Sequence, residues 1–365
     1  MADTVTTGGQ PILSTPEAVT AERLTAVLRA AGQIANAAVT SVTFEPIGLG
    51  LLGDTMRFHI GYDRQEERAP ASLAGKFPAT EPHVRASGKE IGVYLTEISF
   101  YQSLASQLPV RSPDCYYAVI EPETCEFGLL LEDVGPARAA DQLVGCSRAD
   151  AENALLQAAA LHAPRFRDES LWSIDWMDIR YRVLGRACDN FSQYVEIFLE
   201  RYADMLEPEY QRLVTQFAPV VREFVLKKPE RFSLVHADLR LDNMLFDAKG
   251  GEVPVVILDW QSIAPENPGI DFSYFIGTSY PMDLRSRDER ELVQYYHEQV
   301  QSFGARDYAW DDVWHDYRRG AWLGLFTAIF ASAVAKRTDR GDQMFMRMAR
   351  GSAAQMVEHD TLSLA

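Results

Sequence analysis

Four polar residues in a largely apolar stretch have the types and the spacing to do chemistry together. His236, Asp238 and Asn243 follow the pattern HxDxxxxN in SLVHADLRLDNMLFD, and Asp259 comes directly after the apolar run VPVVIL. A carboxylate can accept a proton from a hydroxyl group, while an amide oxygen and a second carboxylate are ligands that suit Mg²⁺. Transfer of a phosphoryl group from ATP to a hydroxyl requires these groups. The stretch therefore predicts a kinase.

The elements around these residues should bring them together. SLVHA is typical of a short strand, and MLFD and VPVVILDW are typical of two more strands joined by the Gly-rich turn AKGG. Asp238 and Asn243 then lie on a loop, and the hairpin returns Asp259 toward it. Asp and Asn are also common turn formers, so a single HxD would indicate only a turn. The complete set in this context favours the catalytic interpretation.

A glycine-rich segment near the N-terminus could cover phosphate groups. Residues 48–53 read GLGLLG, with Gly48, Gly50 and Gly53 at GxGxxG spacing. A dinucleotide site needs a helix directly after the glycines, whereas DTMRFHI alternates like a strand. Strand, glycines and strand form the phosphate-covering turn of a kinase. A plain hairpin turn is the alternative that stays open.

Lys76 places an ammonium group in the apolar strand LAGKF. Burial of an unpaired charge is costly, so an anionic partner is expected. Glu97 on the following helix is the candidate, with the phosphates of ATP on the other side. The alternative is an edge-strand lysine that reaches into solvent.

The hydrophobic pattern divides the chain into a sheet-rich part and a helical part. Residues 1–15 are polar and predict a flexible arm, and a helix is expected to start at Pro16 with Thr15 as its cap. Strands are expected at residues 41–47, 54–62, 71–77, 115–122 and 127–135, and a single helix over residues 90–108. From about residue 148 the pattern is mostly helical. The predicted fold class is α+β, with a small antiparallel-sheet lobe over residues 16–133, a hinge near residues 132–135, and a large, mostly helical lobe over residues 134–365.

Composition restricts the possible partners. The chain has 365 residues, is 47% hydrophobic and carries a net charge of −17. This charge argues against nucleic acid as a partner, because phosphate backbones repel an acidic surface. The apolar run at 321–335 is shorter than the ~20 residues of a membrane span, so no membrane partner is expected. Four scattered cysteines predict reduced thiols in a cytoplasmic protein: Cys115, Cys125, Cys146 and Cys188.

Three segments together resemble a known group of enzymes. HADLRLDNMLF, ILDWQ and GIDFSYFIGTS are similar to the aminoglycoside phosphotransferase and choline kinase superfamily, and most similar to its ecdysteroid kinase-like branch. The resemblance spans residues 40 to 345. It implies a protein-kinase-like fold of two lobes, ATP and Mg²⁺ as cofactors, and a hydroxyl of a small molecule as the phosphate acceptor.

The resemblance also implies a role for each matching residue. Asp238 matches the catalytic base, and Arg240 stands where protein kinases have a lysine, which implies contact with the transferred phosphate. Ala237 stands where the superfamily often has glycine. The other matches are Asn243 and Asp259 as magnesium ligands, Lys76 and Glu97 as the phosphate-positioning pair, Gly48 to Gly53 as the phosphate loop, Glu132 to Val134 as the adenine-binding hinge, and Asp271 as an acid that braces the catalytic loop.

The acceptor is predicted to be neutral or lipophilic, and the protein a monomer or homodimer. Residues 166–202, between the hinge and the catalytic loop, are rich in aromatics, most of which should be core. Their acids are spaced as on a solvated helix face. An aminoglycoside or another cationic metabolite remains an alternative acceptor, and a non-catalytic nucleotide-binding protein remains an alternative function. His162, at a helix end, is expected to be a cap or a packing residue.

Overall fold

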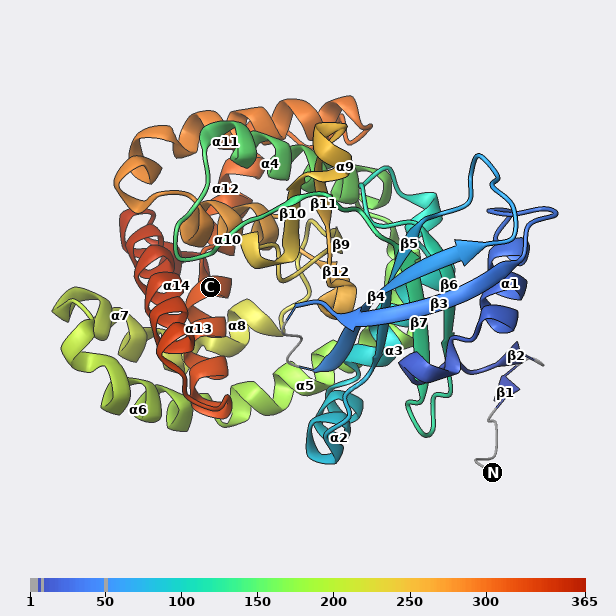
Figure 1. The fold of residues 1–365 in the computed structure, drawn as a ribbon. Coiled ribbons are helices and arrows are strands. Elements are labelled where there is room, and N and C mark those ends of the chain that lie inside the picture. Colours follow the sequence, from blue (N-terminus) through green and yellow to red (C-terminus); the bar gives the residue numbers. More distant parts are fainter. Residues whose placement is uncertain (1–5, 8–9, 49–51) are drawn as a thin grey trace. The chain divides into compact units, whose positions relative to one another are not determined.

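The chain divides into two compact units, which Figure 1 shows coloured along the sequence. The computed structural model describes residues 6–7, 10–48 and 52–365. The N-terminal unit comprises the chain up to Gln107, Ser112–Gly135 and Asp259–Gln261. The C-terminal unit comprises Leu108–Arg111, Pro136–Leu258 and Ser262–Ala365. The main division thus follows Gly135, and the segment that begins with Asp259 belongs to the N-terminal unit although it lies late in the sequence.

The N-terminal unit is built on a five-stranded antiparallel sheet in the order β3-β4-β5-β7-β6. The strands are β3 (Val39–Pro46), β4 (Gly53–Tyr62), β5 (Ser72–Pro78), β6 (Cys115–Ile120) and β7 (Phe127–Glu132), and two short strands, β1 (Thr6–Thr7) and β2 (Gln10–Pro11), precede them. Alternation along β4 turns Phe58 into a core that includes Leu73 and Leu130. The strands expected from the hydrophobic pattern are confirmed.

Helices α1 (Ala21–Ala30), α2 (Pro82–Ile91) and α3 (Val93–Ser103) complete this unit, and their bounds correct two predictions. The single helix expected over residues 90–108 is wrong. Gly92 adopts φ +77°, a left-handed conformation that ends α2 before α3 begins. The helix expected from Pro16 is a short 3₁₀ turn followed by α1, and Thr20, rather than Thr15, caps α1 by accepting from Arg23 N at 3.3 Å.

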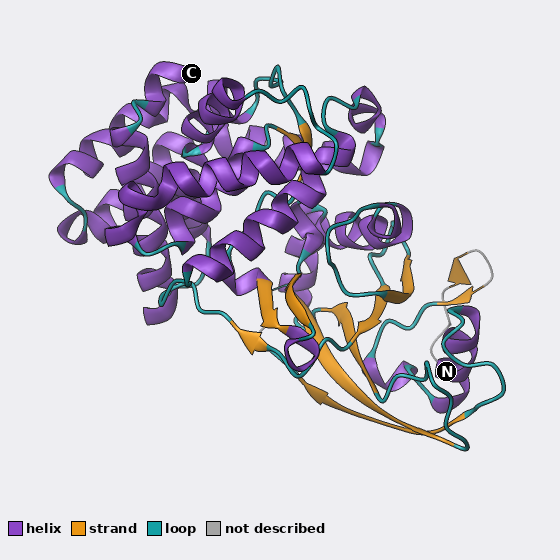
Figure 2. Cartoon of the chain, turned by 90° about the horizontal axis from the view of Figure 1, so that it is seen from above, coloured by secondary structure: helices purple, strands orange, loops and turns teal. Residues whose placement is uncertain are grey.

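The C-terminal unit is mostly helical, as Figure 2 shows by its purple helices. Its helices are α4 (Arg148–His162), α5 (Asp178–Asp189), α6 (Phe191–Tyr202), α7 (Pro208–Phe217), α8 (Val221–Val225), α9 (Ala248–Gly251), α10 (Gly269–Ser279), α11 (Met282–Ser302), α12 (Trp310–Gly320), α13 (Trp322–Val334) and α14 (Asp339–Glu358). Its strands are β8 (Arg138–Ala139), β9 (Ser233–Val235), β10 (Met244–Asp247), β11 (Val253–Ile257) and β12 (Ala264–Glu266).

Two small sheets in the C-terminal unit carry the predicted catalytic segment. Strands β10 and β11 form the expected hairpin, in which Met244 pairs with Ile257, and β9 pairs with β12. The turn between β10 and β11 includes Gly250 at φ +71° and Gly251 at φ +99°, which glycine adopts without strain. The apolar run 321–335 forms α13, which packs in the main core, and among the described residues no helix is long and apolar enough to cross a membrane.

Helix α10 is the most buried helix of the C-terminal unit, since all of its residues are buried. Glycines let its main chain touch two neighbouring helices. A Cβ atom on Gly320 of α12 would lie 2.3 Å from Gly269 O, and one on Gly351 of α14 would lie 2.0 Å from Gly277 O. Real Cβ atoms do not approach a carbonyl oxygen this closely, so both crossings require glycine.

Gly351→Ala is therefore expected to lower the free energy of unfolding by about 1–3 kcal/mol, because the added methyl group overpacks the contact with α10. Urea denaturation of wild type and variant measures the difference. Gly185 on α5 is the matched control, since nothing lies within 4 Å of a Cβ added there. Gly185→Ala is expected to leave the stability unchanged or raise it by about 0.5–1 kcal/mol, and equal losses in both variants would contradict the close crossing.

Candidate active site

The catalytic loop, residues 236–243, brings the predicted polar side chains together around Asp238. Asn243 Nδ2 donates to Asp238 Oδ2 at 2.8 Å, and Arg240 Nε lies 3.1 Å from Asp238 Oδ1. The negative charge of Asp238 raises the pKa of Arg240 against the opposing effect of burial, so the guanidinium stays charged. The Asn243 amide points its nitrogen at Asp238, which leaves Oδ1 as the atom that could bind a metal ion.

His236 is buried and ties the loop to the end of strand β11. Its Nε2 lies 2.9 Å from Leu258 O and its Nδ1 lies 3.3 Å from Asp238 N. Because a backbone carbonyl only accepts and a backbone N–H only donates, the proton is on Nε2. Leu258 N in turn donates to Asn243 O at 2.9 Å. Both backbone groups of Leu258, the residue before Asp259, are thus held by the catalytic loop. His236 therefore positions the catalytic loop relative to Leu258.

Asp271 braces the first part of the loop, as the resemblance implies. Its carboxylate accepts from His236 N and Ala237 N at 2.7 Å each, and His162 Nε2 lies 3.0 Å away. Burial by itself raises the pKa of Asp271, but the hydrogen bond and charge of His162 hold this pKa below its ordinary value of 3.8. His162 also contacts Tyr296 OH through Nδ1 at 2.8 Å. It is therefore more than a helix cap, because it orients the acid that holds the loop.

Ala237 has a backbone conformation that glycine adopts more easily. Its φ is +61°, in the left-handed region. That conformation costs an L-residue roughly 1–2 kcal/mol. The two hydrogen bonds that Asp271 accepts from Ala237 and its neighbour His236 stabilise this turn.

Tyr274 is a partner of Asp238 that the sequence reasoning missed. Its hydroxyl donates to Asp238 Oδ1 at 3.2 Å from the fully buried helix α10. Burial, helped by the charge of Asp238, raises the pKa of Tyr274 well above 10, so the phenol stays neutral and can donate. Tyr274 lies three residues after Asp271, on the same helix face. That spacing is the signal that could have identified it.

The N-terminal unit holds a second charged group of predicted site residues. Lys76 Nζ lies 2.6 Å from Glu97 Oε2 and 3.5 Å from Asp259 Oδ1, so the expected pairing of Lys76 with Glu97 is confirmed. Burial lowers the pKa of Lys76, but the two carboxylates hold it above its ordinary value of 10.5. Burial, opposed by Lys76, raises the pKa of Glu97 above 4.5. The side chain of Glu97 is only 4% exposed, whereas that of Asp259 is 37% exposed and accessible to a ligand.

The two residues after Asp259 attach this segment to helix α3. Trp260 stacks on Phe100 with ring centroids 4.1 Å apart, and Gln261 Nε2 donates to Glu97 Oε2 at 3.1 Å. Asp259 itself has φ +62°, a conformation that aspartate tolerates better than most residues. The segment therefore holds Asp259 beside Lys76 in two ways: Trp260 packs on Phe100, and the Glu97 carboxylate binds both Gln261 and Lys76.

The predicted phosphate loop is only partly described. Gly48 has φ +75°, which requires glycine or a strained residue. Gly53 begins β4, and a Cβ atom there would lie 2.9 Å from Phe77 O on the adjacent strand. Gly50 lies outside the described residues. The contact of these glycines with phosphate stays a prediction.

The predicted hinge is anchored by a residue that the sequence reasoning did not single out. Glu132 ends β7 and Val134 is buried, while Asp133 between them points back to the sheet. Asp133 accepts from Arg57 Nε at 2.8 Å and from Ser72 Oγ at 2.7 Å. These bonds fix the end of β7 to β4 and β5. Binding of adenine by Glu132 and Val134 stays a prediction.

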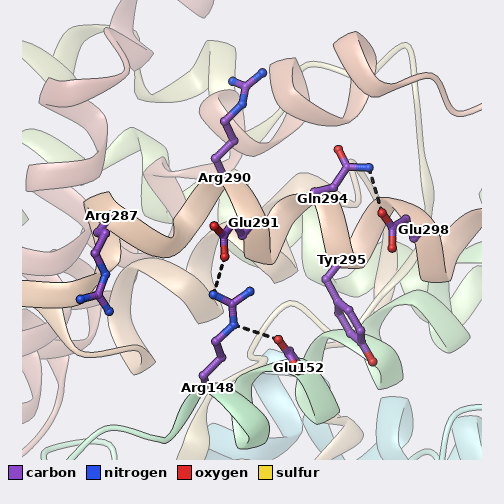
Figure 3. A pocket seen from close by; sticks show the side chains of 8 residues that line it. All are labelled: Arg148, Glu152, Arg287, Arg290, Glu291, Gln294, Tyr295 and Glu298. Atoms are coloured by element: carbon purple, nitrogen blue, oxygen red, sulfur yellow. Dashed lines mark hydrogen bonds and ion pairs between the residues drawn. The ribbon is translucent and has the colours of Figure 1, made fainter.

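A hollow between α4 and α11 contains none of the predicted site residues (Figure 3). Arg148 on its wall pairs with Glu152 at 2.9 Å and with Glu291 at 2.6 Å. The side chains that line it are Arg148, Glu152, Arg287, Arg290, Glu291, Gln294, Tyr295 and Glu298. Because opposite charges on its walls pair with each other, this hollow has the character of a solvated charged surface.

A group of potential metal ligands near the C-terminus has a different explanation. Glu289, Glu358 and His359 offer ligand atoms within 4.8 Å of one another. Arg285, however, lies 2.6 Å from both carboxylates. Its guanidinium already pairs with both, so the group is a partly buried ion-pair network.

Comparison with known proteins places these features in a family. The sequence profile of the ecdysteroid kinase-like family matches residues 51–305. Acyl-CoA dehydrogenase family member 10 from Mus musculus is 26% identical over 103 residues, which are 25% of this chain and 10% of that protein. The chain thus spans about a tenth of the length of this curated relative.

Two solved structures show the fold. Choline kinase from Cryptosporidium parvum Iowa II aligns with a TM-score of 0.53 and 12% identity, covering 88% of this chain and 92% of that one. The GDP complex of wild-type aminoglycoside 2'-phosphotransferase-IIIa aligns with a TM-score of 0.52 and 13% identity, covering 90% of this chain and 96% of that one. The predicted kinase-like fold, with a small antiparallel sheet and a mostly helical C-terminal part, is confirmed.

Asp271→Asn is expected to lower the free energy of unfolding at pH 7 by about 3 kcal/mol, because it breaks a buried charged contact. The pKa of Asp271 lies below 3.8 in the folded protein. Its stabilising effect is therefore complete above that pH and is lost as the pH falls through the lower folded-state value. Urea unfolding from pH 7 to pH 3 measures the gap between wild type and variant, which should narrow below about pH 3.8.

The exposed Asp204 is the control, since Asp204→Asn should change the stability by less than about 0.5 kcal/mol. A gap between wild type and Asp271→Asn that stayed constant down to pH 3 would contradict the brace.

Proposed function

The chain belongs to the ecdysteroid kinase-like family, and we propose that it transfers the γ-phosphoryl group of ATP to a hydroxyl group of a small molecule. The observation that carries the proposal is the catalytic loop. Asp238 is held there by Asn243 and Tyr274, and a buried acid fixes the adjoining backbone. These contacts support a role for Asp238 as proton acceptor, and phosphoryl transfer asks little other covalent chemistry of the protein.

Asp238 acts as the general base in this proposal. A base contributes to proton transfer when its acceptor oxygens are fixed relative to the substrate hydroxyl. Tyr274 and Asn243 each bind one oxygen of Asp238, which restricts rotation of the carboxylate. Arg240 stays charged beside it, and we propose that this guanidinium contacts the transferred phosphate.

We propose that Asn243 and Asp259 each supply an oxygen ligand to a magnesium ion. The amide oxygen of Asn243 and the carboxylate of Asp259 are hard oxygen ligands, and Asp259 is exposed enough to bind. Magnesium, when bound, neutralises charge on the phosphate oxygens. Lys76 keeps its short contact with Glu97, and we propose that phosphates replace its longer contact with Asp259.

We propose that the acceptor is neutral or lipophilic. A polycationic acceptor would need several carboxylates that are free to pair with its ammonium groups. Four of the acids between the hinge and the catalytic loop are instead paired with basic side chains of the chain itself: Asp168 with Arg165, Glu169 with Lys228, Asp178 with Arg182 and Asp189 with Arg222. These pairs favour a solvated surface over a cation-binding pocket.

Asp238→Asn is expected to lower the rate of phosphate transfer about 10²- to 10⁴-fold, because the amide cannot accept the proton. The affinity for ATP should change little, since the base does not hold the nucleotide. A mass-spectrometric screen of hydroxylated metabolites for an ATP-dependent gain of phosphate identifies an acceptor, and calorimetry measures ATP binding.

The matched control is Asp259→Ala, which should remove the magnesium-dependent part of ATP binding because Asn243 alone is a poor site. Undiminished phosphate transfer by the Asp238→Asn variant would contradict the assignment of Asp238 as the base. Unchanged binding of magnesium and ATP to the Asp259→Ala variant would contradict the assignment of Asp259 as a metal ligand.

Kanamycin is expected to leave the release of ADP at its basal rate, and expression in a sensitive host is expected to confer no resistance. The physical reason is that four acids between the hinge and the catalytic loop already pair with basic side chains of the chain. A coupled assay of ADP release with and without kanamycin tests this. Resistance that disappears in the Asp238→Asn variant would instead establish a cationic acceptor.

A further inference from the structure

Gln142, in the segment between β8 and α4, has a buried side chain amide in which every hydrogen-bonding position is used. Its Nε2 donates to Thr278 O at 2.9 Å and to Thr278 Oγ1 at 3.1 Å. Its Oε1 accepts from Leu241 N at 3.0 Å and from Ser279 Oγ at 3.2 Å. A glutamine amide has two N–H donors and two oxygen lone pairs, so these four contacts saturate it.

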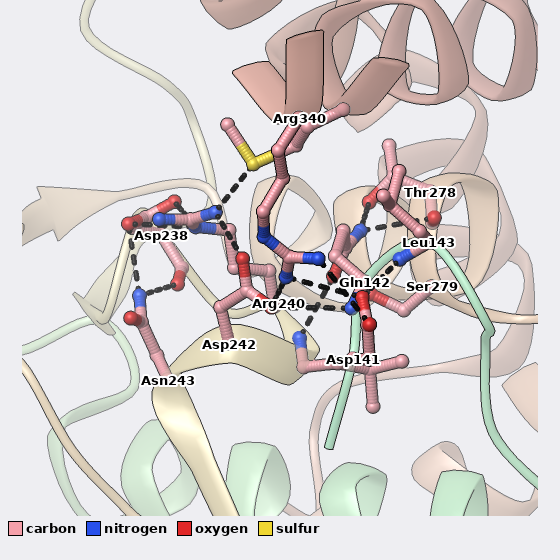
Figure 4. A network of polar contacts seen from close by, with 12 residues as sticks. Asp141, Gln142, Leu143, Asp238, Arg240, Asp242, Asn243, Thr278, Ser279 and Arg340 are labelled. Atoms are coloured by element: carbon pink, nitrogen blue, oxygen red, sulfur yellow. Dashed lines mark hydrogen bonds and ion pairs between the residues drawn. The ribbon is translucent and has the colours of Figure 1, made fainter. Parts of the chain in front are cut away.

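The orientation of this amide follows from its partners. Leu241 N can only donate and Thr278 O can only accept. If the nitrogen and oxygen of the Gln142 amide were exchanged, a donor would face the donor Leu241 N and an acceptor would face the acceptor Thr278 O. Figure 4 shows Gln142 with Thr278 and Ser279 of α10 on one side and Asp242 of the catalytic loop on the other. The main chain of Gln142 adds a further contact, because its N–H donates to Asp242 Oδ1 at 3.1 Å.

Leu241 begins the short 3₁₀ turn Leu241–Asn243 of the catalytic loop. The first N–H groups of such a turn lack partners within it, and a preceding side chain often accepts from them. Arg240 precedes this turn, and an arginine side chain has no acceptor. Gln142 therefore does from a distant part of the sequence what a cap residue does locally.

Helix α10 then holds the catalytic loop at two places. Asp271 and Tyr274 bind its first part directly, at Ala237 and Asp238. The C-terminal end of α10 reaches the second part of the loop through Gln142. Resting on the proposed phosphotransferase function, we infer that Gln142 is a positioning residue, which sets the distance between Asp238 and Asn243 by linking Leu241 to α10.

Gln142→Met tests this role, because methionine has a similar length and no strong donor or acceptor. The probe is basal ATP hydrolysis, with water as the acceptor. The kcat is expected to fall roughly 10- to 100-fold, since small displacements of catalytic groups have effects of this size. The KM for ATP should stay within about twofold. Hydrogen exchange of the backbone amides of residues 236–243 should become about tenfold faster.

Gln355→Met is the matched control. Gln355 is equally buried and donates to Ser273 O of α10 at 3.3 Å from helix α14. This variant removes one buried hydrogen bond to α10 that does not involve the catalytic loop, so kcat and the exchange of residues 236–243 are expected to stay unchanged. Thr278→Val, in which valine has nearly the shape of threonine, removes the Oγ1 contact of Gln142 and keeps the contact with the carbonyl of residue 278. It should move both readouts in the same direction as Gln142→Met by a smaller amount.

The inference is overturned if Gln142→Met and Thr278→Val leave kcat and loop exchange unchanged, or if Gln355→Met alters them equally. A wild-type protein that neither releases ADP nor phosphorylates any hydroxylated metabolite would defeat the proposed function separately. In that case the exchange of residues 236–243 still decides whether Gln142 holds the loop.

Discussion

The catalytic loop depends on one buried carboxylate, that of Asp271. A loop that presents polar side chains to a ligand must also satisfy its own buried backbone groups. Asp271 accepts from two successive N–H groups, at His236 and Ala237, and so fixes the turn in which Ala237 adopts a left-handed conformation. Burial of this acid is unfavourable alone, and His162 offsets it. The position of Asp238 follows from this pair, because Asp238 is the next residue along the fixed backbone.

The charges around Lys76 are unbalanced in a way that suits a cationic ligand, because two carboxylates contact one ammonium group. One ammonium, on Lys76, lies between the carboxylates of Glu97 and Asp259. The raised pKa of Glu97 reflects both its burial and this surplus of negative charge. When the charge of Asp259 is neutralised, the pKa of Glu97 is expected to fall part of the way back toward its ordinary value. The Lys76 to Glu97 pair is thus coupled to whatever binds at Asp259, since all three groups share one field.

The sequence predicts best the features that lie close together along the chain. The HxDxxxxN spacing, the β10–β11 hairpin and the strands of the N-terminal sheet follow from local pattern and turn chemistry, and the pairing of Lys76 with Glu97 follows from the cost of burying a charge. Contacts between segments that are far apart in the sequence are harder to predict. Gln142 and Leu241 are far apart in sequence, and a lone glutamine in a connecting segment has no local pattern that separates it from a surface residue. The break at Gly92 was visible in principle, because glycine commonly ends helices.

Packing and chemistry meet in helix α10. Its first turn carries Asp271, its middle carries Tyr274 and its last turn binds Gln142, so a small shift of this helix moves these three supports of the catalytic loop together. Close-packed helices transmit such shifts because few voids absorb them. Gly320 and Gly351 touch the main chain of α10 from two helices and bear no functional group. A side chain at either position would displace α10, and the displacement would reach Asp238 through the hydrogen bonds of Tyr274 and Asp271. Residues that only permit close contact between helices therefore belong to the support of the site as much as the acids do.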